Sequence, residues 1–220
     1  MPSLDTLTAF FGVAVLLALV PGPDNVFVLL QSAQRGWRAG MAVVLGLCAG
    51  VLVHTAAVAL GLAALFAASA GAFTVLKLCG AAYLLWLAWQ SLRSAPVTPP
   101  PVQAMATSAP KTVAPVFHPG ALRMAGRGMA MSLSNPKVLI FFLAFLPQFA
   151  DPARGPVAPQ LLVLGFVFML AALLVFGAIA CFSGAFGALL QRSARAQRLL
   201  AQVSALVFVG LAVRLVVVSG

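Results

Sequence analysis

The chain has 220 residues, of which 63% are hydrophobic and only 7% are charged. Its mean hydropathy of +1.10 is too high for a soluble domain of this length and is typical of a helical protein with several membrane spans. Thirteen Lys and Arg residues against three acids give a formal net charge of +10, but the cations are scattered between apolar runs and lack the aromatic interleaving of a nucleic-acid-binding surface. We therefore interpret them as signals of membrane topology.

Six apolar segments follow one another along the chain. Each has about 20 residues or more, enough for a helix to cross ~30 Å of hydrocarbon at about 1.5 Å per residue. They are residues 8–30, 40–68, 72–92, 129–149, 159–190 and 200–218. The pattern predicts an all-α polytopic membrane protein with six transmembrane helices, of which the second and fifth tilt in the bilayer or protrude from it.

The first apolar segment is interrupted by "PGPDN", which is Pro21, Gly22, Pro23, Asp24 and Asn25. Proline inside a helix removes a backbone donor and frees upstream carbonyl groups, whereas proline at the first position of a helix suits its fixed φ. We therefore expect two half-helices, the second of which begins at Pro23. The N–H groups and the positive dipole end at such a start attract an anion, which suits Asp24.

The second segment has a histidine in "GLCAGVLVHTAA". His54 follows Gly50 by about one helical turn, and Gly50 follows Gly46 by another, so the three share a face that another helix can approach closely. Because histidine titrates near physiological pH, His54 is a candidate carrier of a coupled proton. The alternative is a neutral ring bonded to a backbone carbonyl, and both interpretations stay open.

Residues 95–120, after the third segment, are rich in proline and poor in charge, which predicts an irregular cytoplasmic linker. The linker separates a first three-helix repeat, residues 1–94, from a second, residues 121–220. Because three is odd, the two repeats insert with opposite orientations. This is the inverted-repeat arrangement of many secondary transporters.

The fourth segment has a matching interruption, "SNPK", with Asn135, Pro136 and Lys137. Aligning Pro23 with Pro136 places Asp24 opposite Lys137, and broken segments at corresponding positions of two halves indicate a transporter's central site. The helix dipole disfavours a cation in the first turn, and a charge near the bilayer centre costs about 2.5 to 3.5 kcal/mol on insertion scales. Lys137 therefore needs a partner, which is Asp24, a substrate carboxylate, or each in turn.

The two interruptions also have a purely structural interpretation. Prolines often kink membrane helices, and Asp24 and Lys137 would then form a permanent salt bridge between the halves. Two matched motifs of opposite charge favour a site in which Asp24 and Asn25 bind an ammonium group, while Lys137, Asn135 and the half-helix start bind a carboxylate. Asp24 is, with His54, the second candidate for proton coupling. The predicted substrate-binding residues are Pro21, Gly22, Pro23, Asp24, Asn25, Asn135, Pro136 and Lys137.

The cations are distributed unevenly between the connections. The side that follows the first, third and fifth segments carries Arg35, Arg38, Arg93, Lys111, Arg123, Arg127, Arg192, Arg195 and Arg198. The opposite side has only Arg154, together with Asp151 and Asp5. By the positive-inside rule, both termini are predicted to lie outside the cytoplasm.

Other polar residues have weaker interpretations. Lys77 and Arg214 lie near the outer ends of their segments, where we expect their side chains to extend to the headgroups. Gln148 is a candidate gate or cap at the outer end of the fourth segment. The three cysteines stand singly in apolar surroundings and are interpreted as packing residues, which predicts no metal site and no disulfide. They are Cys48, Cys79 and Cys181.

Four motifs carry a family resemblance. "LVPGPDNVFVL", "GLCAGVLVHTAAVALGLAALF", "GAAYLLWLAWQSLR" and "SNPKVLIFFLAFLPQF", in this order, resemble the LysE/RhtB family of amino-acid exporters. The resemblance covers nearly the whole chain and is weakest in the linker and the last two segments. It implies a multi-pass protein of the bacterial inner membrane that exports amino acids or close derivatives by proton antiport, with the amino acid, protons and lipid as partners. Homo-oligomerisation stays open.

The sequence does not favour an enzyme. It contains no Walker A loop, no Gly-x-Gly-x-x-Gly motif and too few acids for acid–base chemistry, so no cofactor is expected. Two alternatives to amino-acid export remain. One is efflux of a metal cation or another small solute, for which the thiols and His54 would have to converge. The other is a membrane scaffold without a transported substrate.

Overall fold

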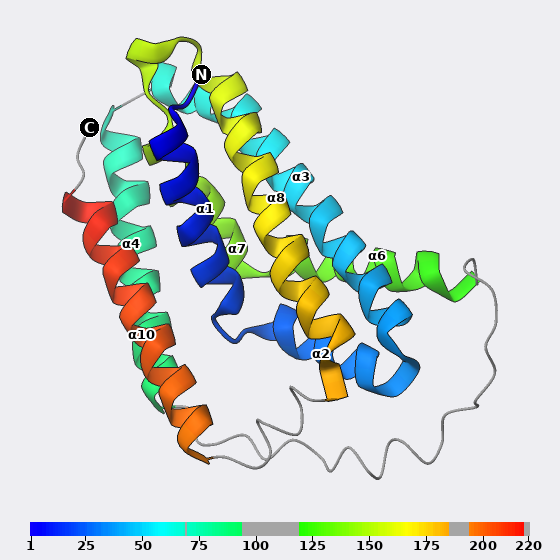
Figure 1. Cartoon of the computed structure of the whole chain (residues 1–220). Helices are drawn as coiled ribbons and strands as arrows, with labels where there is room; N and C mark the ends of the chain where they lie inside the picture. Colours follow the sequence, from blue (N-terminus) through cyan, green and yellow to red (C-terminus); the bar gives the residue numbers. More distant parts are fainter. Residues whose placement is uncertain (69, 94–118, 185–193, 218–220) are drawn as a thin grey trace.

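A computed structural model describes residues 1–68, 70–93, 119–184 and 194–217, and in this part of the chain every regular element is a helix (Figure 1). This agrees with the predicted all-α class. In chain order the elements are α1 (Leu4–Leu19), α2 (Pro23–Arg35), α3 (Trp37–Ala68), α4 (Ala70–Arg93), α6 (Pro119–Ser134), α7 (Pro136–Ile140), the π-helix η1 (Phe141–Phe145), the 3-10 helices η2 (Leu146–Phe149) and η3 (Pro152–Arg154), α8 (Val157–Cys181) and α10 (Ala194–Val217).

Four of these helices, α3, α4, α8 and α10, are long and apolar enough to cross a membrane. Two further candidates are bent pairs: α1 and α2 meet at 63°, and α6 meets the segment from α7 to η2 at 55°. The described residues therefore hold four spans, or up to six if each bent pair is one span. The breaks occur where they were predicted, because α2 begins at Pro23 and α7 begins at Pro136.

The helices form a bundle around α3 and α8. Helix α3 packs against α6 on one side and α8 on the other, α1 packs against α8, and α4 packs against α10. Figure 1 shows α3 and α8 running side by side, the α4–α10 pair on the flank next to α1, and α6 extending towards the opposite flank. The start of α1 and the end of α10 lie at the same end of the bundle (Figure 1).

The predicted close approach at the glycines of α3 is confirmed, and its partner is α6. A Cβ atom at Gly46 would collide with the backbone carbonyl of Ala125, and one at Gly50 would lie 2.5 Å from the Cβ of Ser132. Small residues let two helix backbones approach in this way. The contact positions the end of α6, from which the second break starts.

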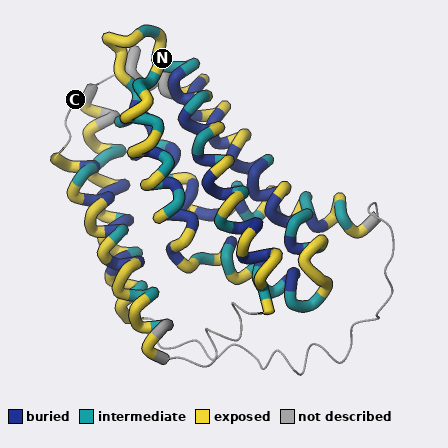
Figure 2. Tube along the Cα trace, viewed as in Figure 1, coloured by how far each residue is buried: buried dark blue, intermediate teal, exposed yellow. Residues whose placement is uncertain are grey.

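Burial separates the inner faces of the bundle from the outer ones. Figure 2 shows buried residues along the facing sides of α3 and α8, and many exposed residues along α4 and α10. The exposed side chains include large apolar ones such as Leu78, Leu174 and Leu206. In a protein with membrane-spanning helices, such side chains face hydrocarbon.

Two boundaries differ from the predicted segments. Apart from residues 119 and 120, which begin α6, the predicted linker lies outside the described residues, as does the predicted end of the fifth segment at residue 190. Hydropathy predicts that the fourth segment starts at residue 129, but α6 begins at Pro119. Its first half is amphipathic: Met124 is buried, whereas Arg123 and Arg127 are exposed and lower the hydropathy of the window.

The fourth segment is also less regular than its apolar pattern predicts. After α7 it continues as the π-helix η1 and then as the 3-10 helix η2, which contains Pro147. Proline lacks the N–H group that a continuous α-helix requires. Short π-helical stretches are frequent at functional sites, and this one directly follows the second break.

Candidate functional site

The two helix breaks meet inside the bundle, and Lys137 joins them. Its Nζ atom donates hydrogen bonds to the carbonyl oxygens of Val20, at 3.1 Å, and Leu17, at 3.3 Å. These carbonyls belong to the end of α1, where the break leaves them without helical partners and where the helix dipole is negative. The buried ammonium group of Lys137 therefore caps α1 from the other half of the chain.

Asn135 connects the two half-helix starts. Its Oδ1 atom accepts a hydrogen bond from the backbone N–H of Lys137 at 3.0 Å, which caps α7. Its Nδ2 atom donates to Oδ2 of Asp24 at 2.7 Å. Since one partner is a donor and the other an acceptor, the orientation of the amide is determined. Asn135 thus links the start of α7 to the start of α2.

Asn25 contributes to the same junction, but not only as a group facing a substrate. Its Nδ2 atom donates to the carbonyl oxygen of Ala18 at 2.8 Å, so Asn25 and Lys137 together satisfy three carbonyls at the end of α1. Two buried acceptors at the junction, Oδ1 of Asp24 and Oδ1 of Asn25, have no hydrogen-bond partner. Buried polar atoms are rarely left unpaired, so these two oxygens mark the place where a donor would be bound.

Asp24 and Lys137 do not form a direct ion pair. Among the described residues the one ion pair within 4.0 Å joins Arg154 and Asp151, at 3.5 Å. The permanent salt bridge of the structural interpretation is therefore absent from this conformation. Asp24 and Lys137 are connected through Asn135 instead.

Gly22 allows the close contact between the halves. A Cβ atom at this position would lie 3.1 Å from Nζ of Lys137 and 3.8 Å from Oδ1 of Asn25. A side chain here would therefore crowd the lysine. Pro21 and Pro23 flank this glycine, and Pro23 and Pro136 start their half-helices, so these residues shape the junction through the backbone.

A small cavity adjoins the junction. Its polar lining comes from Asp24, Ser132 and Lys137, and its apolar lining includes Phe168 and Phe176 of α8. The volume of about 10 Å³ holds about one water molecule. An amino acid is much larger, so the halves must move apart at this point before such a molecule can enter.

His54 lies behind the second break. Its Nε2 atom is 3.2 Å from the carbonyl oxygen of Ser132, and its ring centroid is 5.7 Å from that of Phe142. The same carbonyl accepts a hydrogen bond from the backbone N–H of Asn135 at 3.2 Å. This contact matches the structural interpretation of His54, and it also places the imidazole one residue contact away from Asn135.

Several residues of the site were not predicted. Ser132 precedes Asn135 by three residues and is a polar residue within an apolar run, which is a signal that sequence reasoning could have used. Phe168 and Phe176 carry no such signal, because phenylalanine is common throughout the segments. Of the cysteines, Cys48 is buried, whereas Cys79 and Cys181 are exposed, so the predicted packing role inside the protein is wrong for the latter two.

Comparisons with known proteins agree with this architecture. The family model described as LysE type translocator matches residues 15–219. An uncharacterized membrane protein of Vibrio cholerae is 37% identical over 158 residues, covering 71% of this chain and 70% of the relative. No solved structure matches the chain.

Two relatives have names that state a transported compound. The homoserine/homoserine lactone efflux protein of Salmonella typhimurium is 34% identical over 157 residues, covering 71% of this chain and 70% of the relative. The leucine efflux protein of Enterobacter sp. is 29% identical over 206 residues, covering 92% of this chain and 90% of the relative. Because the family model extends from the first break motif to the last helix, the chain belongs to the LysE family of translocators, which is a family of membrane transporters.

Proposed function

We propose that this chain is a secondary active exporter of amino acids or their close derivatives in a bacterial inner membrane, and that it works by proton antiport. The junction of the two breaks carries the proposal. There the ammonium group of Lys137 and an unpartnered carboxylate oxygen of Asp24 line one cavity. An amino-acid zwitterion presents the two complementary charges. The relatives named for homoserine and leucine efflux support the same class of substrate.

The existing contacts suggest how binding is linked to movement. The substrate ammonium group binds Oδ1 of Asp24 and Oδ1 of Asn25, which have no partner in this conformation. The substrate carboxylate binds Lys137, whose ammonium group is engaged by the carbonyls of Leu17 and Val20. When Lys137 exchanges these carbonyls for a carboxylate, the link between α1 and α7 weakens, and the small cavity can widen.

We also propose that each bent pair is one span, which gives six spans in two inverted repeats, residues 1–94 and 121–220. The packing supports a two-fold relation between the halves. Helices α3 and α8 are the second spans of their halves and pack together, as do the third spans α4 and α10. The contact of α3 with α6 corresponds to that of α8 with α1.

The inverted-repeat proposal predicts the orientation of the chain. A reporter fused after Gly220 should register as periplasmic, and one inserted at Thr107 should register as cytoplasmic, because the Arg and Lys residues concentrate on the linker side. Paired phosphatase and fluorescent-protein fusions measure this. If both positions report the same side, the odd number of spans per half is wrong.

Proton coupling predicts a specific loss of transport. Proteoliposomes with an imposed pH gradient should concentrate a labelled amino acid against its gradient. Collapsing the pH gradient should abolish this accumulation while exchange of labelled for unlabelled amino acid continues. L-leucine and L-homoserine are the first compounds to test, followed by the remaining common amino acids.

The matched variant for coupling is His54→Gln, which can still donate a hydrogen bond to the carbonyl of Ser132 but cannot titrate in this pH range. If His54 carries the proton, the variant should lose the pH dependence of transport while keeping exchange. An unchanged pH profile would leave Asp24 as the remaining candidate. Accumulation without any ion gradient would contradict antiport, metal-dependent flux would favour cation efflux, and no flux of any solute would favour a scaffold.

A further inference from the structure

A second cavity lies at the end of the bundle where α1 begins and α10 ends. Three segments line it: the first turns of α1, residues 148–151 after η1, and Arg214 of α10. Its volume is about 370 Å³, which is within the range of small-molecule binding sites. The junction of the breaks contributes none of its lining residues.

Arg214 supplies a positive charge to this cavity. Its guanidinium carbon lies 4.0 Å from the ring centroid of Phe149 and 5.6 Å from that of Phe145. Among the contacts of the described residues, Arg214 has no hydrogen bond and no ion pair. Stacking on a ring holds a guanidinium group in place and leaves its N–H donors available for a carboxylate. The structure thus adds a specific contact to the predicted position of Arg214 near the outer surface.

The same cavity also presents acceptors. The Oε1 atom of Gln148 is buried and has no hydrogen-bond partner, whereas its Nε2 atom donates to the carbonyl of Ala144. The exposed carboxylate of Asp5 lies in the lining as well. Asp151 is partly occupied, because it accepts from the backbone N–H of Ala153 and lies 3.5 Å from Arg154. Asp5 and Gln148 are therefore the acceptors that an ammonium group would meet.

Aromatic rings separate the two cavities. Phe168 lines the cavity at the junction, and its ring centroid is 5.3 Å from that of Phe141. Phe141 is 6.0 Å from Phe10, and Phe10 is 4.9 Å from Phe149, which lines the second cavity. A continuous series of rings thus runs from one cavity to the other. A solute that leaves the junction towards this end must displace these rings and then enters the second cavity.

We propose that the second cavity is an exit site that binds the zwitterionic part of an exported amino acid, with Arg214 binding the carboxylate and Asp5 and Gln148 binding the ammonium group. The identity of the ligand rests on the proposed function. The existence of a site with both charges rests on the cavity itself.

Protection of a thiol from labelling tests this proposal. The native residues Cys48, Cys79 and Cys181 are replaced by alanine, and Ala9→Cys introduces one thiol into the exposed lining of the second cavity. Spheroplasts are treated with a membrane-impermeant maleimide, with and without an equimolar mixture of the common amino acids and homoserine. We expect the mixture to slow labelling at least about threefold by mass action, and propionate or propylamine at the same concentration to have little effect.

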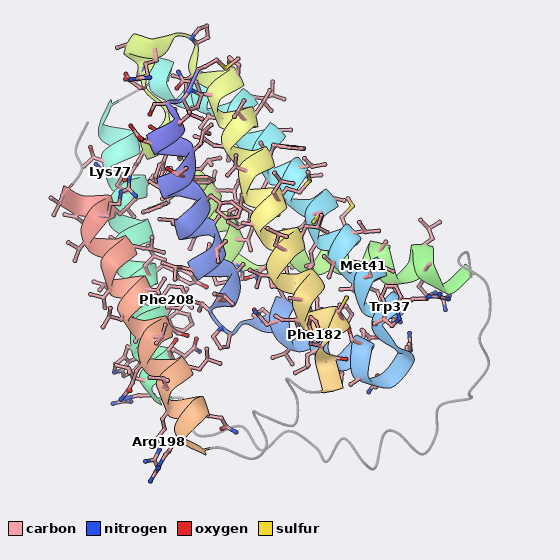
Figure 3. The ribbon with its side chains drawn as sticks, in the orientation of Figure 1. Trp37, Met41, Lys77, Phe182, Arg198 and Phe208 are labelled. Carbon is pink, nitrogen blue, oxygen red and sulfur yellow. The ribbon has the colours of Figure 1, made fainter. Side chains whose placement is uncertain are left out.

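Three variants separate this site from the junction. Arg214→Gln should abolish the protection, and Arg214→Lys should retain part of it, because a lysine keeps the charge but not the planar fork. Arg198→Gln, at the opposite end of α10, should leave protection unchanged (Figure 3). Lys137→Gln should retain protection, because the ligand binds outside the junction.

The outcomes are distinguishable. Labelling that is absent from the outside, is not slowed by amino acids, or is slowed equally by propionate would overturn the exit site. Protection that disappears in Lys137→Gln would also overturn it, since the signal would then come from the junction. If no amino acid is transported although protection depends on Arg214, the exit site stands and the proposed transport function is wrong.

Discussion

Asp24→Asn and Lys137→Gln are each expected to reduce transport by about 100-fold or more, and the double variant is expected to fold but to stay inactive. Removing one charge of a buried charged pair costs about 3 to 5 kcal/mol, and each 1.4 kcal/mol corresponds to a factor of ten. If the substrate carries the complementary charges, no second substitution in the protein restores what the first one removed. Initial flux rates in proteoliposomes, with matched protein amounts, measure the effect.

The contacts at the junction explain why these variants should fold. An asparagine at position 24 still accepts a hydrogen bond from Nδ2 of Asn135, and a glutamine at position 137 still has donors for the carbonyls of Val20 and Leu17. Arg198→Gln removes an exposed cation from α10 and serves as the control. Thermal unfolding should be similar for all four proteins. A double variant with restored transport would contradict the site and would leave the two charges with an architectural role.

Gly46→Ala is expected to destabilise the protein strongly, because its Cβ atom would collide with the backbone carbonyl of Ala125 in α6. A backbone atom cannot turn away as a flexible side chain can, so α3 and α6 would have to separate. Overpacking of this kind typically costs about 1 to 3 kcal/mol. The variant should therefore show a lower melting temperature and a lower yield of folded protein.

Gly61→Ala in the same helix is the matched control. A Cβ atom at Gly61 has no other atom within 4 Å. Alanine favours a helix over glycine by about 0.5 to 1 kcal/mol, so this variant should be as stable as the wild type or more stable. Equal melting temperatures for Gly46→Ala and Gly61→Ala would show that the close contact between α3 and α6 contributes nothing.

The helix breaks could be predicted from the sequence because their cause is local. Pro23 and Pro136 cannot continue a helix but suit its first position, and both half-helices begin at these residues. Likewise, Gly46 and Gly50 share a face by spacing alone, which predicted a close helix contact without naming its partner. Local chemistry and helical periodicity were sufficient for these features.

The partners of the charged residues could not be predicted in the same way. Alignment of the two breaks placed Asp24 and Lys137 opposite each other, but the lysine contacts backbone carbonyls of α1, and Asn135 binds the aspartate. These contacts depend on how α7 packs against the end of α1, which no sequence spacing encodes. For the same reason the cavity beside Arg214 was not predicted, since it combines residues from the beginning, middle and end of the chain.

The measurement that most directly tests the central claim is amino-acid binding at the junction by the purified protein. An Arg214→Gln background removes the outer cavity from the signal, and the mixture of common amino acids and homoserine serves as the ligand. A ligand that binds only the native state raises the melting temperature. We predict that the background protein is stabilised by the mixture, and that adding Asp24→Asn or Lys137→Gln abolishes this stabilisation while adding Arg198→Gln does not. Equal stabilisation of all four proteins would contradict the assignment of Asp24 and Lys137 as the substrate site.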